Sequence, residues 1–500
     1  MNTNHTRMII GKCLLIAGAL LLNTMVSFSQ RQITLKEALN IAFENSPEIR
    51  KTRLEMEQRR ELLNANLAAL KSRFTLDVSP IQYQKRQTYD EFTSQWYTSE
   101  NKGANGSFSV TQPIQLTDGT LILKNDFAYQ DNYSEAGNTT NKGYNNSLYL
   151  RYDQPLFKYN KTKMGLKRNE LSLENATLTH SIQMLSMESQ VSRAFYNIYQ
   201  KQMGLKVAKE DFENQKISKK IIESKVEGGL MAKEELYQAE LNYATSESAV
   251  KDRVVDLENA MDEFKQLLGL SLFEKIDVKT DIEYVPVVVD LEKAIQNGLA
   301  QRLELSQRKI DLNNAEFDLI ETAARNKFSG NVGLSFGYMG NDSKFQDIYN
   351  RPTKSPEVGI TFSIPVFDWG ERKARIRAAE LEIESRQIDM KQLEDDIVIK
   401  IRRTYRDLNN YTRKISIENQ NVKNAQLTYD INLERYRNGD LTSMDLERFQ
   451  SQLSEKKMSL VNAKISYKLE LLNMKIQSLW DFENNRSFVP QELQRNMKSE

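Results

Sequence analysis

Residues 436–446 read Tyr436-Arg-Asn-Gly439-Asp-Leu-Thr-Ser-Met-Asp445-Leu446, and they separate two long segments that contain neither glycine nor proline, 371–438 and 441–482. Glycine adopts positive φ without steric cost, so Gly439 is a natural place for a helix to stop and for the chain to reverse. The first segment, if wholly helical, would extend for roughly 100 Å at 1.5 Å per residue. The sequence therefore predicts a very long helical hairpin with its tip near 438–441.

The same pattern occurs earlier, in Lys225-Val-Glu-Gly-Gly229-Leu-Met-Ala-Lys-Glu-Glu235-Leu236. Gly229 lies 210 residues before Gly439 (439 − 229), and Glu235 lies 210 residues before Asp445 (445 − 235). A constant offset over a long stretch indicates a tandem duplication. The same offset relates the segments Pro155-Leu-Phe157 and Pro365-Val-Phe367.

The duplication predicts two repeats, 30–270 and 290–482, joined by a non-helical spacer at 271–289. Each repeat is expected to hold short helices, a pair of strands and a long helical hairpin, with the first tip near 228–230. The polar residues 483–500 are expected to form a tail that lies loosely on the outside.

Residues 1–29 have the features of a secretory signal peptide. Arg7 and Lys12 precede a short apolar run, and Ser27 and Ser29 place small side chains just before the predicted cleavage site. The apolar run is too short for a typical membrane anchor.

Removal of the signal peptide leaves few residues for metal or thiol chemistry. It takes away Cys13, the only cysteine, and leaves His180 as the only histidine. Disulfides, thiol catalysis and Cys/His zinc sites are excluded by this inventory, and no Gly-x-x-x-x-Gly-Lys-Ser/Thr phosphate loop is present. The net charge of +1 gives no sign of a nucleic-acid surface. We therefore expect no catalytic site, no metal and no cofactor.

Several segments ahead of the long helices alternate apolar and polar residues, which is typical of strands with one apolar face. The interpretations left open are a half-buried soluble sheet and the wall of a membrane barrel. Proline cannot donate to a sheet ladder, so Pro155 and Pro365, with Phe157 and Phe367, are predicted to mark the strand-to-helix junctions. The alternating segments are 74–79, 107–111, 120–129, 147–152, 331–338 and 358–364.

Together these features resemble the TolC family of outer-membrane factors, the outer membrane efflux proteins. The resemblance covers the mature chain and is carried by four motifs: Thr34-Leu-Lys-Glu-Ala-Leu39, Gln154-Pro-Leu-Phe157, Ile364-Pro-Val-Phe367 and the tip Tyr436 to Asp445. It implies a mainly α fold with a membrane β-barrel. Long coiled-coil hairpins of three protomers would form an α-barrel, and each protomer would add about four strands to the β-barrel.

The resemblance also implies a function. A homotrimer would be the channel-tunnel of a tripartite efflux pump or a type I secretion system, a passive export duct without enzymatic activity. It would sit in outer-membrane lipid of a Gram-negative bacterium, with its helices in the periplasm. Its partners would be a periplasmic adaptor (membrane fusion protein) and an inner-membrane transporter.

The resemblance places a periplasmic gate at the tips, formed by Gly229, Glu235, Tyr436, Gly439 and Asp445. Asp445 matches an acidic position of the family, and in a trimer it and Glu235 would form stacked negative rings that favour cations. The alternative is that these carboxylates lie on solvated helix surface. Tyr436 is expected either to make a gate hydrogen bond or simply to pack.

One departure from the family concerns the strands, because the first repeat has an additional alternating pair at 107–111 and 120–129. This pair either elaborates an extracellular hairpin or widens the barrel, and we favour the hairpin. Among other functions, a soluble or surface-attached coiled-coil scaffold explains the helices but not the matched strands. A periplasmic adaptor would show one hairpin flanked by lipoyl-like modules.

Overall fold

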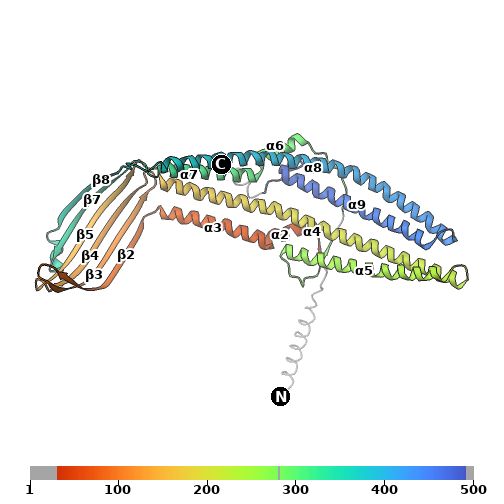
Figure 1. Cartoon of the computed structure of the whole chain (residues 1–500), viewed down its shortest axis with the longest axis horizontal. Coiled ribbons are helices and arrows are strands. Elements are labelled where there is room, and N and C mark those ends of the chain that lie inside the picture. Colours follow the sequence, from red (N-terminus) through yellow and green to blue (C-terminus); the bar gives the residue numbers. More distant parts are fainter. Residues whose placement is uncertain (1–30, 280–281, 491–500) are drawn as a thin grey trace, which may run out of the picture. The chain divides into compact units, whose positions relative to one another are not determined.

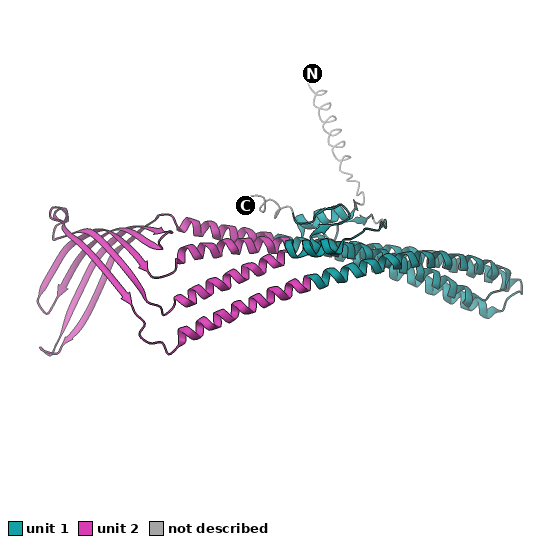
Figure 2. Cartoon of the chain, turned by 90° about the horizontal axis from the view of Figure 1, so that it is seen from above, with its two compact units in different colours: residues 1–51, 183–301, 398–494 teal, residues 52–182, 302–397, 495–500 magenta. Residues whose placement is uncertain are grey.

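The computed structural model describes residues 31–279 and 282–490, so the predicted signal peptide lies outside the described residues. The chain divides into two compact units, shown in different colours in Figure 2. Unit 1 comprises Met1–Lys51, Gln183–Gln301 and Val398–Gln494, and unit 2 comprises Thr52–Ile182, Arg302–Ile397 and Arg495–Glu500. Each unit therefore contains segments of both repeats.

Helices make up most of the described chain (Figure 1). Two of them are very long: α4 has 67 residues and α8 has 68. Across the described ranges, none of the helices combines the length and the apolar character needed to cross a membrane. The helices are α2 (Leu35–Asn45), α3 (Pro47–Ala69), α4 (Lys161–Glu227), α5 (Lys233–Leu268), α6 (Leu291–Gln301), α7 (Leu303–Ala324), α8 (Glu371–Asn438) and α9 (Ser443–Ser478).

One part of unit 1 is a hydrophobic core at the start of the described chain, with Ile33, Ala38 and Ile41 among its buried members. The Thr34 hydroxyl accepts from the Glu37 N–H at 3.3 Å, and the Glu37 carboxylate accepts from the Thr34 N–H at 2.8 Å. This capping box starts α2. Beside it, strand β1 (Arg31–Ile33) pairs in parallel with β6 (Ile276–Val278), so the spacer between the repeats is held to the start of the first repeat.

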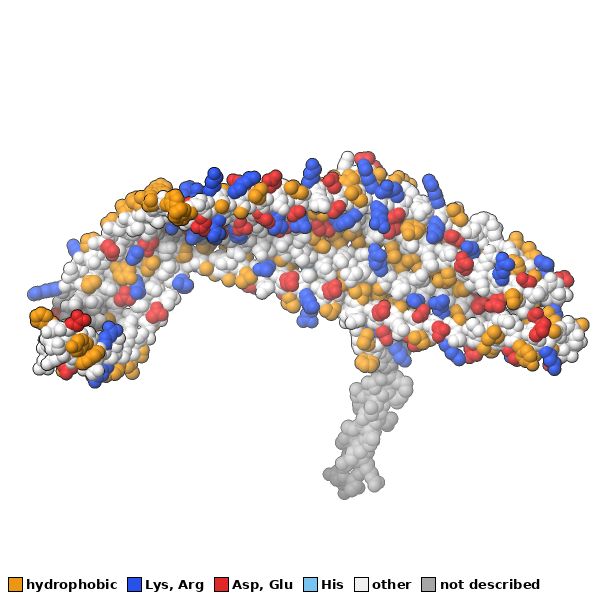
Figure 3. Space-filling model, in the orientation of Figure 1, with side chains coloured by type: hydrophobic (Ala, Val, Ile, Leu, Met, Phe, Trp, Pro, Cys, Tyr) orange, Lys and Arg blue, Asp and Glu red, His pale blue; other side chains and the backbone are white. Residues whose placement is uncertain are grey.

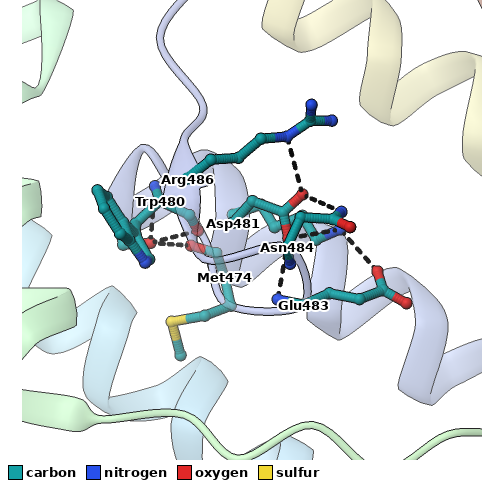
Figure 4. A network of polar contacts seen from close by, with 8 residues as sticks. Met474, Trp480, Asp481, Glu483, Asn484 and Arg486 are labelled. Carbon is teal, nitrogen blue, oxygen red and sulfur yellow. Dashed lines mark hydrogen bonds and ion pairs between the residues drawn. The ribbon is translucent and has the colours of Figure 1, made fainter.

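Of the predicted loose tail, residues 483–490 are held in unit 1, whereas 491–500 lie outside the described residues. Strands β9 (Trp480–Asp481) and β10 (Arg486–Ser487) form a small antiparallel pair around Asp481, which is almost fully buried (Figure 4). Burial acts to raise the pKa of Asp481, but hydrogen bonds from Asn484 and Lys475 outweigh it and hold the pKa below its ordinary value. The physical reason for the difference is that this buried carboxylate needs donors, and the tail supplies one of them, Asn484.

Unit 2 contains a single antiparallel sheet with the strand order β2-β3-β4-β5-β7-β8 (Figure 1). A short 3₁₀ helix, η1 (Phe345–Tyr349), lies between the last two strands. The strands are β2 (Arg73–Asp90), β3 (Gln95–Ile114), β4 (Gly119–Ser134), β5 (Thr139–Leu156), β7 (Ser329–Asp342) and β8 (Thr353–Ser363).

The sheet has six strands in the described chain, two more than the four or so barrel strands that we expected from each protomer. The alternation of apolar and polar residues indicated only residues 107–111 and 120–129 of the two additional strands. The structure extends them to 20 and 16 residues, as β3 and β4, which lie between β2 and β5 in the sheet. Residues 95–106 escaped notice because they are mostly polar on both faces, so a period of two in hydrophobicity is not visible there.

The register gives the sheet one apolar and one polar face. Side chains of directly paired residues lie on the same face. The ladder aligns Leu123 with Leu150, and Leu150 in turn with Phe336. The apolar side chains are exposed in the protomer: 69% for Leu76 and 71% for Val358. Such a large exposed apolar surface marks an interaction with a membrane or another protein.

Candidate functional site: the helix tips and the strand-to-helix junctions

The two long hairpins of unit 1 end in the same backbone motif. After α4, Gly229 has φ +69°, and the Leu230 N–H donates to the Lys225 carbonyl at 2.8 Å. After α8, Gly439 has φ +93°, and the Asp440 N–H donates to the Arg435 carbonyl at 2.9 Å. Both are Schellman turns, which satisfy the last carbonyls of a helix and require a left-handed residue.

Tyr436 lies at the centre of a small core that joins the two tips. Its side chain is fully buried, so it packs as well as hydrogen-bonds: the Ser218 Oγ of α4 donates to the Tyr436 Oη at 3.2 Å. Burial raises the pKa of the Tyr436 hydroxyl, and the bond from Ser218 partly offsets this. The buried members of the core are Ile222, Ala239, Tyr429, Tyr436, Leu446 and Leu453.

Lys225 makes a second link between the tips that sequence reasoning missed. Its Nζ donates to the backbone carbonyls of Tyr436 at 3.2 Å and Arg437 at 3.0 Å, and lies 5.7 Å from the centre of the Tyr436 ring. These carbonyls belong to the last turn of α8, whose end carries partial negative charge. Arg435 occupies the equivalent position of the second hairpin (435 − 225 = 210), but its side chain donates to Asn432 of its own helix, so the repeat carried no signal of this link.

The two predicted acidic positions have different surroundings. The Glu235 Oε2 accepts from the Oγ of buried Ser443 at 2.6 Å, across the two hairpins. Asp445 is exposed, and its Oδ2 accepts from Thr442 Oγ1 at 2.8 Å in the cap of α9. Sequence symmetry therefore does not carry over to the structure, where Glu235 is a bridge between hairpins and Asp445 is a surface carboxylate.

Further polar bridges continue along the same pair of hairpins. The Gln450 side-chain amide donates to Asp211 at 2.6 Å, and the Asn242 amide donates to Glu447 at 2.8 Å. Burial raises the pKa of Asp211, and the hydrogen bond from Gln450 opposes that shift. A groove of about 740 Å³ opens nearby and is lined by residues that include Leu205, Lys206, Lys209, Tyr429 and Lys457.

The junction residues predicted from sequence lie where the sheet of unit 2 gives way to helices. Pro155 is paired with Asn331 near the end of β5. Phe157 follows with φ +62°, and its ring centre lies 5.1 Å from that of Phe328. Pro365 lies between β8 and α8. The Phe367 ring contacts the Trp369 ring at 4.7 Å between centres, so aromatic side chains gather at this end of the sheet.

Within 31–279 and 282–490, no group of three or more His, Cys, Asp and Glu side chains is placed to hold a metal ion. The visible face of the helices shows basic and acidic side chains interspersed (Figure 3). The two hairpins are joined at their tips by noncovalent contacts, which can break and re-form.

Comparison with known proteins decides the family. A family model described as "Outer membrane efflux protein" matches residues 294–475. The chain is 21% identical to Outer membrane protein TolC of Escherichia coli (strain K12), over 71% of this chain and 73% of that protein. These matches indicate the TolC family. It is also 23% identical to Protein CyaE of Bordetella pertussis, over 53% of this chain and 56% of that protein.

Solved TolC-family channels share the fold. The outer membrane channel CmeC of Campylobacter jejuni aligns with a TM-score of 0.69 and 14% identity, covering 93% of this chain and 88% of CmeC. The outer membrane protein VceC of Vibrio cholerae aligns with a TM-score of 0.66 and 13% identity, covering 90% of this chain and 97% of VceC. The expectation of a TolC-like fold is confirmed.

Proposed function

We propose that this TolC-family chain is an outer-membrane channel of a Gram-negative bacterium, serving efflux or secretion as a passive duct. The single observation that carries the proposal is one sheet with an exposed apolar face, joined in the same chain to two long helical hairpins. The relatives are channel proteins, which fits a protein without enzymatic activity.

The sheet has the properties of a membrane barrel wall. Outer-membrane barrels carry an apolar outer band flanked by aromatic girdles and a polar interior. Phe127 and Tyr144 contact Phe345 at one end of the apolar face, and Tyr129 contacts Tyr144 beside them. Phe157, Phe328 and Phe362 meet at the other end. We propose that these two clusters lie at the two interfaces of the outer membrane.

Closure of this wall requires more than one copy. The sheet of a single protomer is open, with β2 and β8 at its edges, and an open edge within lipid would leave backbone groups unsatisfied. We propose a homotrimer, as in TolC-family channels, in which the sheets close one barrel and the long helices form a periplasmic α-barrel.

The tips are the proposed periplasmic gate. The bonds of Ser218 and Lys225 to Tyr436 and its neighbour hold the two hairpins of a protomer together. Gly229 and Gly439 supply the turns. Exposed Asp445 supplies negative charge at the entrance. Glu235, which bonds to Ser443, stabilises the closed arrangement.

A periplasmic adaptor and an inner-membrane transporter are the proposed partners that open the gate and supply the driving energy. The groove along the same hairpins, lined by Lys206, Lys209 and Lys457 together with Glu210 and Glu213, offers charged and apolar surface to the adaptor.

The test is to purify the mature protein in detergent, determine its mass and record current in a planar bilayer. We expect a trimer with small, cation-favouring conductance steps, because the closed tips would limit the current. A protein that needs no detergent and never conducts would overturn the proposal. Such behaviour would instead support a coiled-coil scaffold, which does not explain the exposed apolar face of the sheet.

A further inference from the structure

We infer that β3 and β4 are full-height membrane strands, so that three copies of six strands form an eighteen-strand barrel. This inference rests on the proposed function, because it concerns the width of the proposed membrane duct. The alternative places β3 and β4 outside the membrane as a hairpin, with four strands per copy in the barrel. Contacts at the helix end of the sheet, the register and the side-chain pattern all bear on the choice.

The turn between β3 and β4 reaches the helix end of the sheet. This turn, 115–118, is bound to the start of α4: the Asn160 side chain donates to the Gln115 carbonyl at 2.7 Å. The Asp118 carboxylate accepts from the Thr162 N–H at 3.0 Å and from the Thr162 hydroxyl at 2.6 Å. A carboxylate in this position satisfies the free N–H groups at a helix start.

The end of β3 is fixed at the same level. The Gln112 side chain donates to the Leu70 carbonyl, just after α3, at 2.9 Å, and accepts from the Ser72 hydroxyl at 2.6 Å. A hairpin projecting only outward from the membrane would have its inner ends far from α3 and α4. The end of β3 and the start of β4 therefore lie at the same level of the sheet as the points where β2 and β5 connect to the helices.

The ladder is continuous on both sides of β4. β4 pairs with β3 from Gly119 opposite Ile114 to Ser134 opposite Ser99, and with β5 from Thr120 opposite Asp153 to Ser134 opposite Thr139. A strand needs about 9–11 residues to cross a membrane when tilted. β4 has 16 residues and β3 has 20, so both exceed this length.

The added strands carry the same two faces as their neighbours. Val110 of β3 is aligned with Phe74 of β2 and with Leu123 of β4, and Leu123 is aligned with Leu150 of β5. On the opposite face, Ser109 is aligned with Lys124. A loop outside the membrane has no need for an apolar band in register with the membrane strands.

The order of the strands permits closure between copies. Six antiparallel strands alternate in direction, so β8 of one copy runs opposite to β2 of the next, and both are edge strands. Bacterial barrels have even strand numbers for this reason. Because barrel diameter grows roughly linearly with strand number, eighteen strands give a barrel about 1.5-fold wider than twelve.

A barrel of this width has room for an aqueous passage. The polar face that would line that passage carries small residues, including Ser109 of β3 and Gly333, Ser335 and Gly337 of β7. The membrane barrel would therefore not be the narrow part of the duct, and selection among exported molecules would fall to the tips and the partner proteins.

Single cysteines test the position of β3 and β4 directly, because the mature sequence after predicted cleavage contains no cysteine. Val110→Cys and Leu123→Cys would be labelled with bimane in the full-length mature protein and reconstituted in vesicles with or without brominated lipid. Leu334→Cys, on the apolar face of β7, is the matched membrane control. Ser109→Cys is the matched control for the polar face.

We expect brominated lipid to quench the labels at positions 110 and 123 about as strongly as the label at 334, and to leave position 109 unquenched. Quenching at 334 alone, with 110 and 123 open to a water-soluble maleimide, would overturn the eighteen-strand barrel and leave the proposed channel intact. Absence of quenching at 334 would overturn the proposed channel itself. An electron-microscopy map of the trimer provides a second measurement: eighteen strands are expected, and twelve would contradict the inference.

Discussion

Lys225 of the first hairpin donates a hydrogen bond from Nζ to the backbone carbonyl of Tyr436 in the second hairpin, at 3.2 Å. The same ammonium also donates to the Arg437 carbonyl. A positive charge from α4 therefore caps the C-terminal end of α8, about 200 residues later in the chain. This contact joins the duplicated halves at the point where a duct would have to open.

Loss of that contact should loosen the tips. Lys225→Met keeps most of the apolar stem but removes the charge and both hydrogen bonds, at a cost of about 1–3 kcal/mol to hairpin contact. We expect larger or more frequent conductance steps in planar bilayers. Lys220→Met, at an exposed position of the same helix, is the control and should conduct like the unmodified protein. Equal conductance of all three proteins would remove Lys225 from the gate.

The left-handed turn at the second tip predicts a graded response to substitution. Gly439→Val places a β-branched residue at φ +93°, where it is strained by roughly 1–3 kcal/mol. Gly439→Asn is the matched variant, because asparagine tolerates this conformation better. Trimer yield and export in cells should fall for valine more than for asparagine. Normal yield and export with valine would show that the turn does not constrain assembly.

The acidic residues should differ in their effect on ion selectivity. Asp445→Asn removes an exposed negative charge, so the reversal potential in a salt gradient should move toward zero and block by multivalent cations should weaken. Glu235→Gln should change selectivity less, because that carboxylate is bonded to Ser443. An unchanged reversal potential in the double variant would place both residues away from the pore.

The surroundings of Glu188 in α4 predict that the stability of the protein depends on pH. Burial raises the pKa of its carboxyl to about 7, although Lys475 acts in the opposite direction. The folded protein therefore holds a proton that the unfolded chain releases above about pH 4.5. Stability should fall as the pH rises from about 4.5 to 7, then level off.

The side chain of Glu188 is half-buried, so solvent reduces the effect, and we expect a loss of about 1–2 kcal/mol over this range. Thermal unfolding followed by circular dichroism at several pH values measures it. Glu188→Gln cannot ionise and should show a flatter profile. Parallel profiles for the two proteins would exclude Glu188 as the source.

Much of this protein follows from its sequence, for local physical reasons. The patterns that predict the elements are local: long segments without glycine or proline, glycines at the turns, and alternation along the strands. Because the chain is duplicated at a fixed offset, each pattern can be seen in two places. The four motifs around Thr34, Pro155, Pro365 and Gly439 were enough to indicate the TolC family, and the comparisons confirm it.

Other features depended on residues that meet only after folding. The local sequence does not predict that Lys225 donates to the end of α8 or that Asn484 donates to Asp481. It also does not predict that Glu235 accepts from Ser443 while Asp445 stays exposed. The full length of β3 was also hidden, because polar residues on both faces give no alternation, and only pairing with β2 and β4 defines them as a strand. The sequence by itself determined the elements, their duplication and the family. The tertiary structure decided which side chains join the hairpins and how many strands form the sheet, because hydrogen bonds and strand pairs depend on proximity in space and not on separation along the chain.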